Sequence, residues 1–371
     1  MDDEAIRVGY EVEVSEDRAC FRIIYPTVPQ VDLVEDHILV AAKKLSEREY
    51  LTAEGGAWFA EIQQVVDVLV PMSCETTVPR TAQIVRAGNR EPCLGLNSEL
   101  RFDGMEVEGL VAKPKDFQSG KRYPLLVIIH GGPAGVFQTN FTPRRGAYPI
   151  FAFTDQGYVV FMPNPRGSGG YGEKFRQANV KDWGYGDYKD IMAGVDELIK
   201  QGVADADRMG VMGWSYGGYM TSWVVSQTTR FKAASMGAGL SNLVSMYGTT
   251  DIPPFQEAYF GARAWEDPEL YLKHSAIRFV NQAKTPTLIQ HGQEDRRVPL
   301  SQGEEFYQAL KDVGVATEMV VYPRQPHGIQ EPRLIKDALQ RNLNWFNKWL
   351  LGIEPPVEKK EAKKEEDGKD D

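Results

Sequence analysis

The sequence contains few cysteines and no long apolar run. Its three cysteines, Cys20, Cys74 and Cys93, show no CxxC spacing, and an odd number suits a reducing compartment better than a disulfide framework. The apolar run Leu125–Ile129 is far shorter than the ~20 residues that span a bilayer. The chain opens with MDDE, in place of the basic start and apolar core of a signal peptide. We therefore expect a cytoplasmic protein with no membrane partner.

An excess of positive charge is also absent. The chain has 42 Lys and Arg against 52 Asp and Glu, for a net charge of −10. Surfaces that bind nucleic acid are basic because they neutralise phosphates, so no nucleic-acid partner is expected. With five histidines and no HExxH motif, the chain shows no recognisable pattern of metal ligands. We expect neither a metal nor another cofactor.

The length of 371 residues suits about two domains. Residues 1–97 are predicted to form a small, mostly β accessory segment, because apolar residues alternate with polar ones over 8–14 before a turn and a second apolar run over 20–25. Residues 98–353 are predicted to form the main domain. Residues 354–371 carry eight acidic and five basic residues and no apolar face, which predicts a disordered, charged tail.

Short apolar runs alternate with amphipathic stretches along the main domain. The runs end at glycine, proline or polar turns and are predicted to be buried strands: Tyr123–His130, Tyr158–Asn164, Arg208–Trp214, Pro286–Gly292 and Thr317–Pro323. The stretches are predicted to be helices: Asp187–Gln201, Tyr216–Gln227, Leu300–Val313 and Arg333–Leu351. This alternation predicts an α/β fold with a mostly parallel sheet flanked by helices. Residues 243–283 break the pattern and are predicted to be an insertion.

A G-x-S-x-G motif centred on Ser215 is the sharpest chemical signal. The motif lies between a predicted strand and a predicted helix, where it forms a tight turn that exposes the serine hydroxyl. The turn brings together the positions two before and two after the serine, which are Gly213 and Gly217 here. The N-terminus of the following helix favours developing negative charge. Ser215 is therefore predicted to be a nucleophile, and the alternative is an ordinary glycine-rich turn.

A serine nucleophile needs a general base, and around this motif the chain order is serine, acid, histidine. Three histidines follow Ser215. His274 falls in the predicted insertion and is expected to be a structural or surface residue. His291 lies near a strand end, where its ring is expected to pack locally. His327 follows the last predicted strand, in a loop that would lie over the carboxyl edge of the sheet. His327 is the predicted base.

The orienting acid is expected in the loop after the predicted strand Pro286–Gly292. Glu294 and Asp295 are adjacent there, so only one of them can face the histidine. Asp295 is the predicted acid. In the alternative, Glu294 serves this role and Asp295 caps the next helix or pairs with Arg297.

Two glycine-rich segments follow other predicted strands. In the first, HGGP at His130–Pro133, the N–H of Gly132 is the expected oxyanion donor beside the N–H of Tyr216. The second, NPRGSGGYG at Asn164–Gly172, lacks the Lys-Ser/Thr ending of a P-loop and the spacing of a dinucleotide fingerprint. It is predicted to be a shaped loop in which Arg166 is a structural or substrate-facing cation.

In their order along the chain, these motifs resemble the catalytic domain of the prolyl oligopeptidase family, in its acylaminoacyl-peptidase and dipeptidyl-peptidase-like branch. The segments that carry the resemblance are FDG (102–104), RYP (122–124), HGGP, NPRGSGGYG, DRMGVMGWSYGGYMT (207–221), HGQEDRRVP (291–299) and the loop of His327. The resemblance implies an α/β-hydrolase fold and a triad of Ser215, Asp295 and His327. It also implies hydrolysis of bonds in small peptides or acyl-amino acids.

The region before the main domain departs from the family pattern. Family members usually carry an N-terminal β-propeller, and seven blades of ~40–50 residues need roughly 300 residues. Residues 1–97 can supply two blades at most, so the chain is either a shortened relative or a fragment. The surface that a missing propeller leaves uncovered predicts self-association into a homo-oligomer.

Two further functions compete with a peptidase. A carboxylesterase would use the same triad on small esters, whose leaving groups need less protonation than amines. A non-enzymatic binding module is the third hypothesis, and the complete set of nucleophile, base, acid and oxyanion motifs argues against it. A serine peptidase is the leading prediction.

Overall fold

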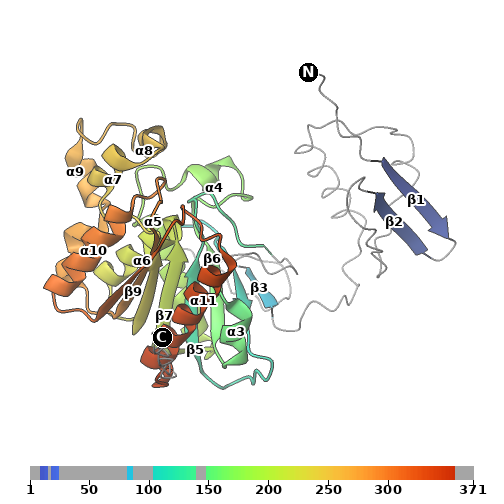
Figure 1. Ribbon diagram of the computed structural model, residues 1–371. Helices are drawn as coiled ribbons and strands as arrows, with labels where there is room; N and C mark the ends of the chain where they lie inside the picture. Colours follow the sequence, from blue (N-terminus) through green and yellow to red (C-terminus); the bar gives the residue numbers. More distant parts are fainter. Residues whose placement is uncertain (1–8, 16–17, 25–81, 87–102, 139–147, 356–371) are drawn as a thin grey trace, which may run out of the picture. The chain divides into compact units, whose positions relative to one another are not determined.

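The computed structural model describes residues 9–15, 18–24, 82–86, 103–138 and 148–355 (Figure 1). Most of the predicted accessory segment and of the predicted tail lies outside these residues. The chain divides into two compact units, residues 1–78 and 79–371. In the first unit, β1 (Gly9–Ser15) and β2 (Arg18–Ile24) form an antiparallel pair, which confirms the predicted hairpin.

The second unit contains one large sheet. Its strands are β3 (Ala82–Arg86), β4 (Glu108–Ala112), β5 (Tyr123–Ile129), β6 (Val159–Asn164), β7 (Ala204–Trp214), β8 (Ala233–Gly237), β9 (Thr287–Gly292) and β10 (Thr317–Tyr322). They lie in the order β10-β9-β8-β7-β5-β6-β4-β3. All neighbouring pairs are parallel except those of β4, which runs antiparallel to β3 and β6. The sheet is mostly parallel, as predicted.

Helices connect the strands and cover both faces of the sheet (Figure 1). They are α3 (Ile150–Asp155), α4 (Glu173–Gln177), α5 (Gly186–Lys200), α6 (Tyr216–Gln227), α7 (Leu243–Thr249), α8 (Pro253–Phe260), α9 (Pro268–Lys273), the 3-10 helix η1 (Ala276–Gln282), α10 (Leu300–Asp312), α11 (Pro332–Phe346) and the π-helix η2 (Asn347–Leu351). The four predicted helices correspond to α5, α6, α10 and α11, which η2 continues. The predicted α/β architecture is confirmed.

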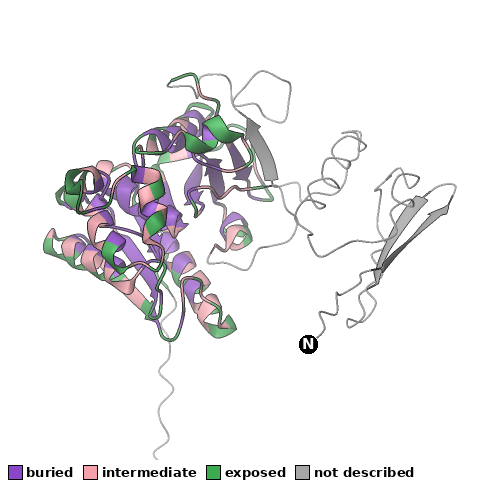
Figure 2. Cartoon of the chain, turned by 90° about the horizontal axis from the view of Figure 1, so that it is seen from above, coloured by how far each residue is buried: buried purple, intermediate pink, exposed green. Residues whose placement is uncertain are grey.

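The two faces of β5 contact different helices, because neighbouring residues of a strand point to opposite sides. Leu125, Val127 and Ile129 lie in one hydrophobic cluster with buried residues of α5, α6 and α10. Leu126 and Ile128 lie in a second cluster with buried residues of α3 and α11. Figure 2 shows that burial follows the strands and the inward sides of the helices. Burial on both faces explains why this strand is continuously apolar.

Three strands of the large sheet lie outside the predicted set. β8 reads AASMG and lacks the large apolar side chains that signal a buried strand. β4 reads EGLVA, a similarly weak signal. β3 pairs with β4, so the second unit begins earlier than the boundary predicted between residues 97 and 98. Backbone pairing decides this boundary, and an apolar pattern does not reveal it.

The stretch between β8 and β9, where the sequence departs from its alternation, holds α7, α8, α9 and η1. It is tied to the loop that follows β9. The hydroxyl of Thr250 donates to the carbonyl of Arg297 at 2.7 Å, and the N–H of Asp251 donates to the carbonyl of Arg296 at 2.9 Å. These bonds place the start of α8 beside the carboxyl end of β9.

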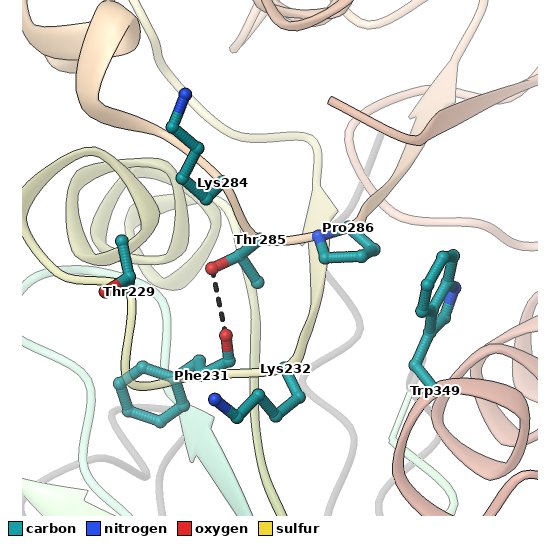
Figure 3. Close-up of a pocket in the computed structure, with 7 residues that line it drawn as sticks. All are labelled: Thr229, Phe231, Lys232, Lys284, Thr285, Pro286 and Trp349. Carbon is teal, nitrogen blue, oxygen red and sulfur yellow. Dashed lines mark hydrogen bonds between the residues drawn. The ribbon is translucent and has the colours of Figure 1, made fainter. Parts of the chain in front are cut away.

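A pocket of about 400 Å³ lies at the amino ends of β8 and β9, on the side of the sheet away from the carboxyl ends of these strands (Figure 3). Its walls come from the segments that precede β8 and β9 and from η2: Thr229, Phe231, Lys232, Lys284, Thr285, Pro286 and Trp349. The hydroxyl of Thr285 donates to the carbonyl of Phe231 at 3.0 Å and joins the two segments. Ligands of open α/β sheets bind at the carboxyl ends of strands, so this pocket is away from the expected site of chemistry.

Within the described part of the chain, every helix is too short or too polar to cross a bilayer.

Phe346 tests the core on the α3 and α11 face of the sheet. Its side chain is fully buried, with the ring centroid 5.7 Å from that of Phe153. We expect Phe346→Ala to lower the free energy of unfolding by about 3–5 kcal/mol, because it leaves a cavity. Phe151 is 50% exposed, so Phe151→Ala should cost less than about 0.5 kcal/mol. Urea unfolding followed by circular dichroism measures both, and equal costs would contradict this packing.

Candidate active site

Ser215 lies in the turn between β7 and α6, with a left-handed φ of 63°. The turn is crowded on both sides of the serine. A Cβ on Gly213 would lie 2.3 Å from the carbonyl oxygen of Gly217, and a Cβ on Gly217 would lie 2.0 Å from that of Ile129. Only glycine fits at these two positions, which accounts for the G-x-S-x-G spacing. The N–H of Ser215 donates to the carbonyl of Gly237 at 2.9 Å, so the adjacent strand holds the turn.

The structure brings Ser215, His327 and Asp295 into one line of hydrogen bonds. Nδ1 of His327 lies 2.8 Å from Oδ2 of Asp295, and its Nε2 lies 2.9 Å from Oγ of Ser215. A carboxylate only accepts hydrogen bonds, so Nδ1 carries the proton and Nε2 is free to accept the hydroxyl proton of the serine. This is the tautomer that a general base needs.

The backbone of its own loop fixes Asp295. Its Oδ1 accepts the N–H groups of Arg297 and Val298, both at 2.9 Å, and its side chain is completely buried. Glu294, the alternative acid, is exposed. Of the two adjacent carboxylates, Asp295 is therefore the one in contact with His327.

His291 also supports the loop that contains Asp295. Its Nε2 donates to the carbonyl of Val298 at 2.8 Å and lies 3.6 Å from Oδ2 of Asp295. Burial lowers the pKa of His291, which keeps the ring neutral. The prediction that this ring packs locally agrees with these contacts, but its place behind the acid was not foreseen.

Trp214, the residue before Ser215, links the serine turn to the histidine loop. Its indole N–H donates to the backbone carbonyl of His327 at 2.7 Å. Sequence analysis missed this contact, since the motif leaves the position between Gly213 and Ser215 open. The serine turn and the His327 loop are thus connected by this contact as well as by the hydrogen bond between Ser215 and His327.

The two expected oxyanion donors belong to segments that meet at Ser215. Tyr216 begins α6 directly after Ser215. In the HGGP segment after β5, Gly132 has a left-handed φ of 132°, and a Cβ on Gly131 would lie 3.9 Å from Oγ of Ser215. The segment therefore passes close to the hydroxyl, where backbone N–H groups can reach an oxygen bound there.

His130 joins the HGGP segment to the NPRGSGGYG loop. Its ring nitrogens lie 2.8 Å from the carbonyl oxygen of Gly131 and 2.9 Å from Oγ of Ser168. Ser168 donates its hydroxyl to the carbonyl of Pro165 at 2.6 Å. Burial lowers the pKa of His130. Its ring bridges the two loops through these contacts.

Arg166 lies in the same loop but faces carboxylates. Its guanidinium makes two 2.8 Å hydrogen bonds to Asp190, through Nε and Nη2, and one of 2.7 Å to Asp103 through Nη1. The side chain is only 7% exposed. Of the two roles predicted for Arg166, these contacts favour the structural one over a contact with substrate.

His274 is also buried, and its ring bonds to a residue other than Ser215. Its Nδ1 lies 2.7 Å from the carbonyl oxygen of Trp183, which fits the structural role expected of it. Among the residues that the structure describes, no group of three His, Cys, Asp or Glu side chains is placed to hold a metal ion.

The sequence between residues 147 and 352, more than half of the chain, matches the family model of the prolyl oligopeptidase family. The chain belongs to this family. The serine turn, the order of acid and histidine and the mostly parallel sheet agree with the α/β-hydrolase fold that the resemblance implies.

Proteins similar to this chain include some that are named as peptidases. The uncharacterized peptidase YuxL of Bacillus subtilis is 36% identical over 266 residues, which are 70% of this chain and 40% of that protein. The acylamino-acid-releasing enzyme of Arabidopsis thaliana is 35% identical over 248 residues, which are 64% of this chain and 32% of that protein. The chain spans less than half the length of either relative.

Solved structures agree with the fold. The acylaminoacyl peptidase of Pyrococcus horikoshii, in its orthorhombic crystal form, is similar with a TM-score of 0.64 and 28% identity. That likeness covers 83% of this chain and 45% of the other. That protein therefore shares this fold and extends well beyond it.

The buried pair of Arg166 and Asp190 tests the structural role of the NPRGSGGYG loop. We expect Arg166→Met to destabilise the protein by about 3–5 kcal/mol, because it leaves a buried carboxylate unpaired. Arg230 pairs with Asp196 where both side chains are at least 36% exposed, so Arg230→Met should cost about 1 kcal/mol or less. Urea unfolding of both variants decides the matter, and a cost for Arg166→Met as small as that for Arg230→Met would contradict the assignment.

Proposed function

We propose that this protein is a serine hydrolase that cleaves peptide or acyl-amino-acid bonds in small substrates through an acyl-enzyme. The single observation that carries the proposal is the line of hydrogen bonds from Ser215 through His327 to Asp295. Membership of the prolyl oligopeptidase family supports the same chemistry.

In the first step, Oγ of Ser215 attacks the substrate carbonyl carbon while Nε2 of His327 takes the hydroxyl proton. The imidazolium that forms is stabilised by Asp295, which holds the ring through Nδ1. The acid does not take up the proton. Its two backbone hydrogen bonds from Arg297 and Val298 hold it in the orientation that this purpose needs.

Negative charge then develops on the former carbonyl oxygen. In this proposal, the N–H groups of Tyr216 and Gly132 donate to that oxygen, and the N-terminus of α6 adds a favourable field. These donors are parts of the backbone and are fixed before the substrate arrives. They therefore need no reorganisation as the charge appears.

His327 next gives its proton to the leaving amine, which departs and leaves an ester on Ser215. Water attacks this ester with His327 acting again as base, and the acid product leaves. An amine is a poor leaving group unless it is protonated. The contact of His327 with Ser215 places the proton where the leaving group will be.

We propose amides rather than esters as substrates because of the names of two relatives. The B. subtilis relative is a peptidase by name, and the A. thaliana relative is an acylamino-acid-releasing enzyme. A carboxylesterase is the second candidate, because the same triad and donors suit an ester.

Paired substrates that share one acyl group separate these two functions. We expect the protein to turn over both a p-nitrophenyl ester and a peptide p-nitroanilide. Ser215→Ala should lower kcat for both by on the order of 10⁴-fold or more, because the nucleophile is lost. Turnover of the ester alone would indicate an esterase, and turnover that survives in Ser215→Ala would overturn the mechanism.

Asp295 and its neighbour offer a matched pair of neutral replacements. We expect Asp295→Asn to lower kcat by about 10³–10⁴-fold, because an amide at this position stabilises the wrong histidine tautomer. Glu294→Gln should leave kcat within about two-fold, since the side chain of Glu294 is exposed and Asp295 is the carboxylate in contact with His327. If Glu294→Gln is the damaging change, the acid has been assigned to the wrong residue.

A further inference from the structure

A buried carboxylate lies behind the nucleophile and takes no part in the proposed reaction. Asp187, in the first turn of α5, is fully buried. Its Oδ2 accepts the hydroxyl of Tyr216, and its Oδ1 accepts the N–H of Tyr188 at 2.8 Å. The side chain of Tyr216, the residue after Ser215, thus connects α6 to α5.

The surroundings of this contact are aromatic. The ring of Tyr216 packs edge-on against Trp183, with centroids 4.9 Å apart, and lies 5.2 Å from the ring of Tyr219. Trp183 and Tyr219 are fully buried, and Tyr216 is 4% exposed. A hydrogen bond in such surroundings is costly to leave unmade, so the contact has a strong preference for one geometry.

The ionisation of Asp187 reflects the same surroundings. Burial raises the pKa of Asp187 to about 7, although the hydrogen bonds from Tyr216 and Tyr188 lower it, and the nearby Asp190 and Asp182 raise it further. Burying a carboxyl group costs free energy, so hydrophobic packing alone does not explain why Asp187 lies at this position. Its position is explained if its acceptor oxygens are needed.

Tyr216 occupies a critical place in the backbone. Its peptide N–H is the proposed oxyanion donor, and the peptide bond that carries this N–H begins at Ser215 in its left-handed conformation. An anchor on the side chain of Tyr216 fixes where α6 begins. It therefore fixes the direction of the N–H groups at the first turn.

We propose that Asp187 is a positioning residue, which holds the oxyanion donor of Tyr216 in place through the tyrosine hydroxyl. This inference rests on the proposed function. Acylation and deacylation both pass through an oxyanion, so a displaced donor slows both steps. Binding of the ground-state substrate depends less on that donor, so kcat should fall while KM changes little.

Three substitutions test the anchor. Removing one oxyanion donor outright costs about 10²–10³-fold in kcat, so a displaced donor should cost about 10-fold. We expect Asp187→Leu and Tyr216→Phe each to lower kcat about 10-fold with KM within two-fold, and the double variant to lose little more than either. Asp187→Asn should retain kcat within about three-fold, because a tyrosine hydroxyl can accept from the amide as well as donate to it.

Two variants on the same helices serve as controls. Tyr219→Phe removes a buried hydroxyl that donates to the carbonyl of His274 at 2.9 Å rather than to Asp187. Asp196→Asn neutralises an exposed carboxylate of α5. Both should keep the kcat of the wild type.

The assay uses the p-nitrophenyl ester, with kcat expressed per serine labelled at completion by a fluorophosphonate. This correction removes any loss of folded protein. Wild-type kcat in a folded Tyr216→Phe variant would overturn the inference, even if Asp187→Leu failed to fold. Independent, multiplying losses in the double variant would also overturn it. Absence of turnover and of labelling in the wild type would instead overturn the proposed function.

Discussion

The left-handed turn at Ser215 is the constraint on which the rest of the site depends. It presents the hydroxyl at the end of β7 only because Gly213, Gly217 and the backbone of Ile129 approach one another within distances that exclude a side chain. Strain of this kind persists where the surroundings hold it in place. Here the holding contacts come from β8 through Gly237, from the indole of Trp214 and from the side chain of Tyr216.

The parallel sheet supplies the remaining groups. The carboxyl ends of parallel strands share one edge, so the loops after β5, β7, β9 and β10 meet there although they are far apart in sequence. These loops carry the HGGP segment, Ser215, Asp295 and His327, in that order along the chain. The proposed mechanism assigns to them an oxyanion donor, the nucleophile, the acid and the base. Hydrogen bonds with backbone groups hold the turn of Ser215, the side chain of Asp295 and the loop of His327. This suits a reaction that depends on groups placed in advance.

Much of this arrangement could be predicted from the sequence, because its signals are local. Large apolar runs marked β5, β6, β7, β9 and β10, and the glycine spacing marked the turn at Ser215. β8 escaped notice because AASMG contains only small residues and one methionine, and its place between two other strands is set by backbone pairing. The boundary between the accessory segment and the main domain was predicted too late in the sequence for the same reason. β3 belongs to the large sheet through its backbone pairing with β4.

The contacts that support the site were harder to foresee. Nothing in the sequence joins Asp187 to Tyr216 or Trp214 to the carbonyl of His327, because these pairs meet only after the helices have packed. For Arg166, the sequence left a structural and a substrate-facing role open. Its contacts with two carboxylates favour the structural role, and the sequence does not reveal these contacts.

The central claim is that Ser215 is an activated nucleophile, and covalent labelling tests it most directly. The folded protein would be treated with a fluorophosphonate, and the modified residue would be located by mass spectrometry of its peptides. We predict a single adduct on Ser215 that disappears in Ser215→Ala. A folded protein that forms no adduct, or forms one elsewhere, would contradict the account.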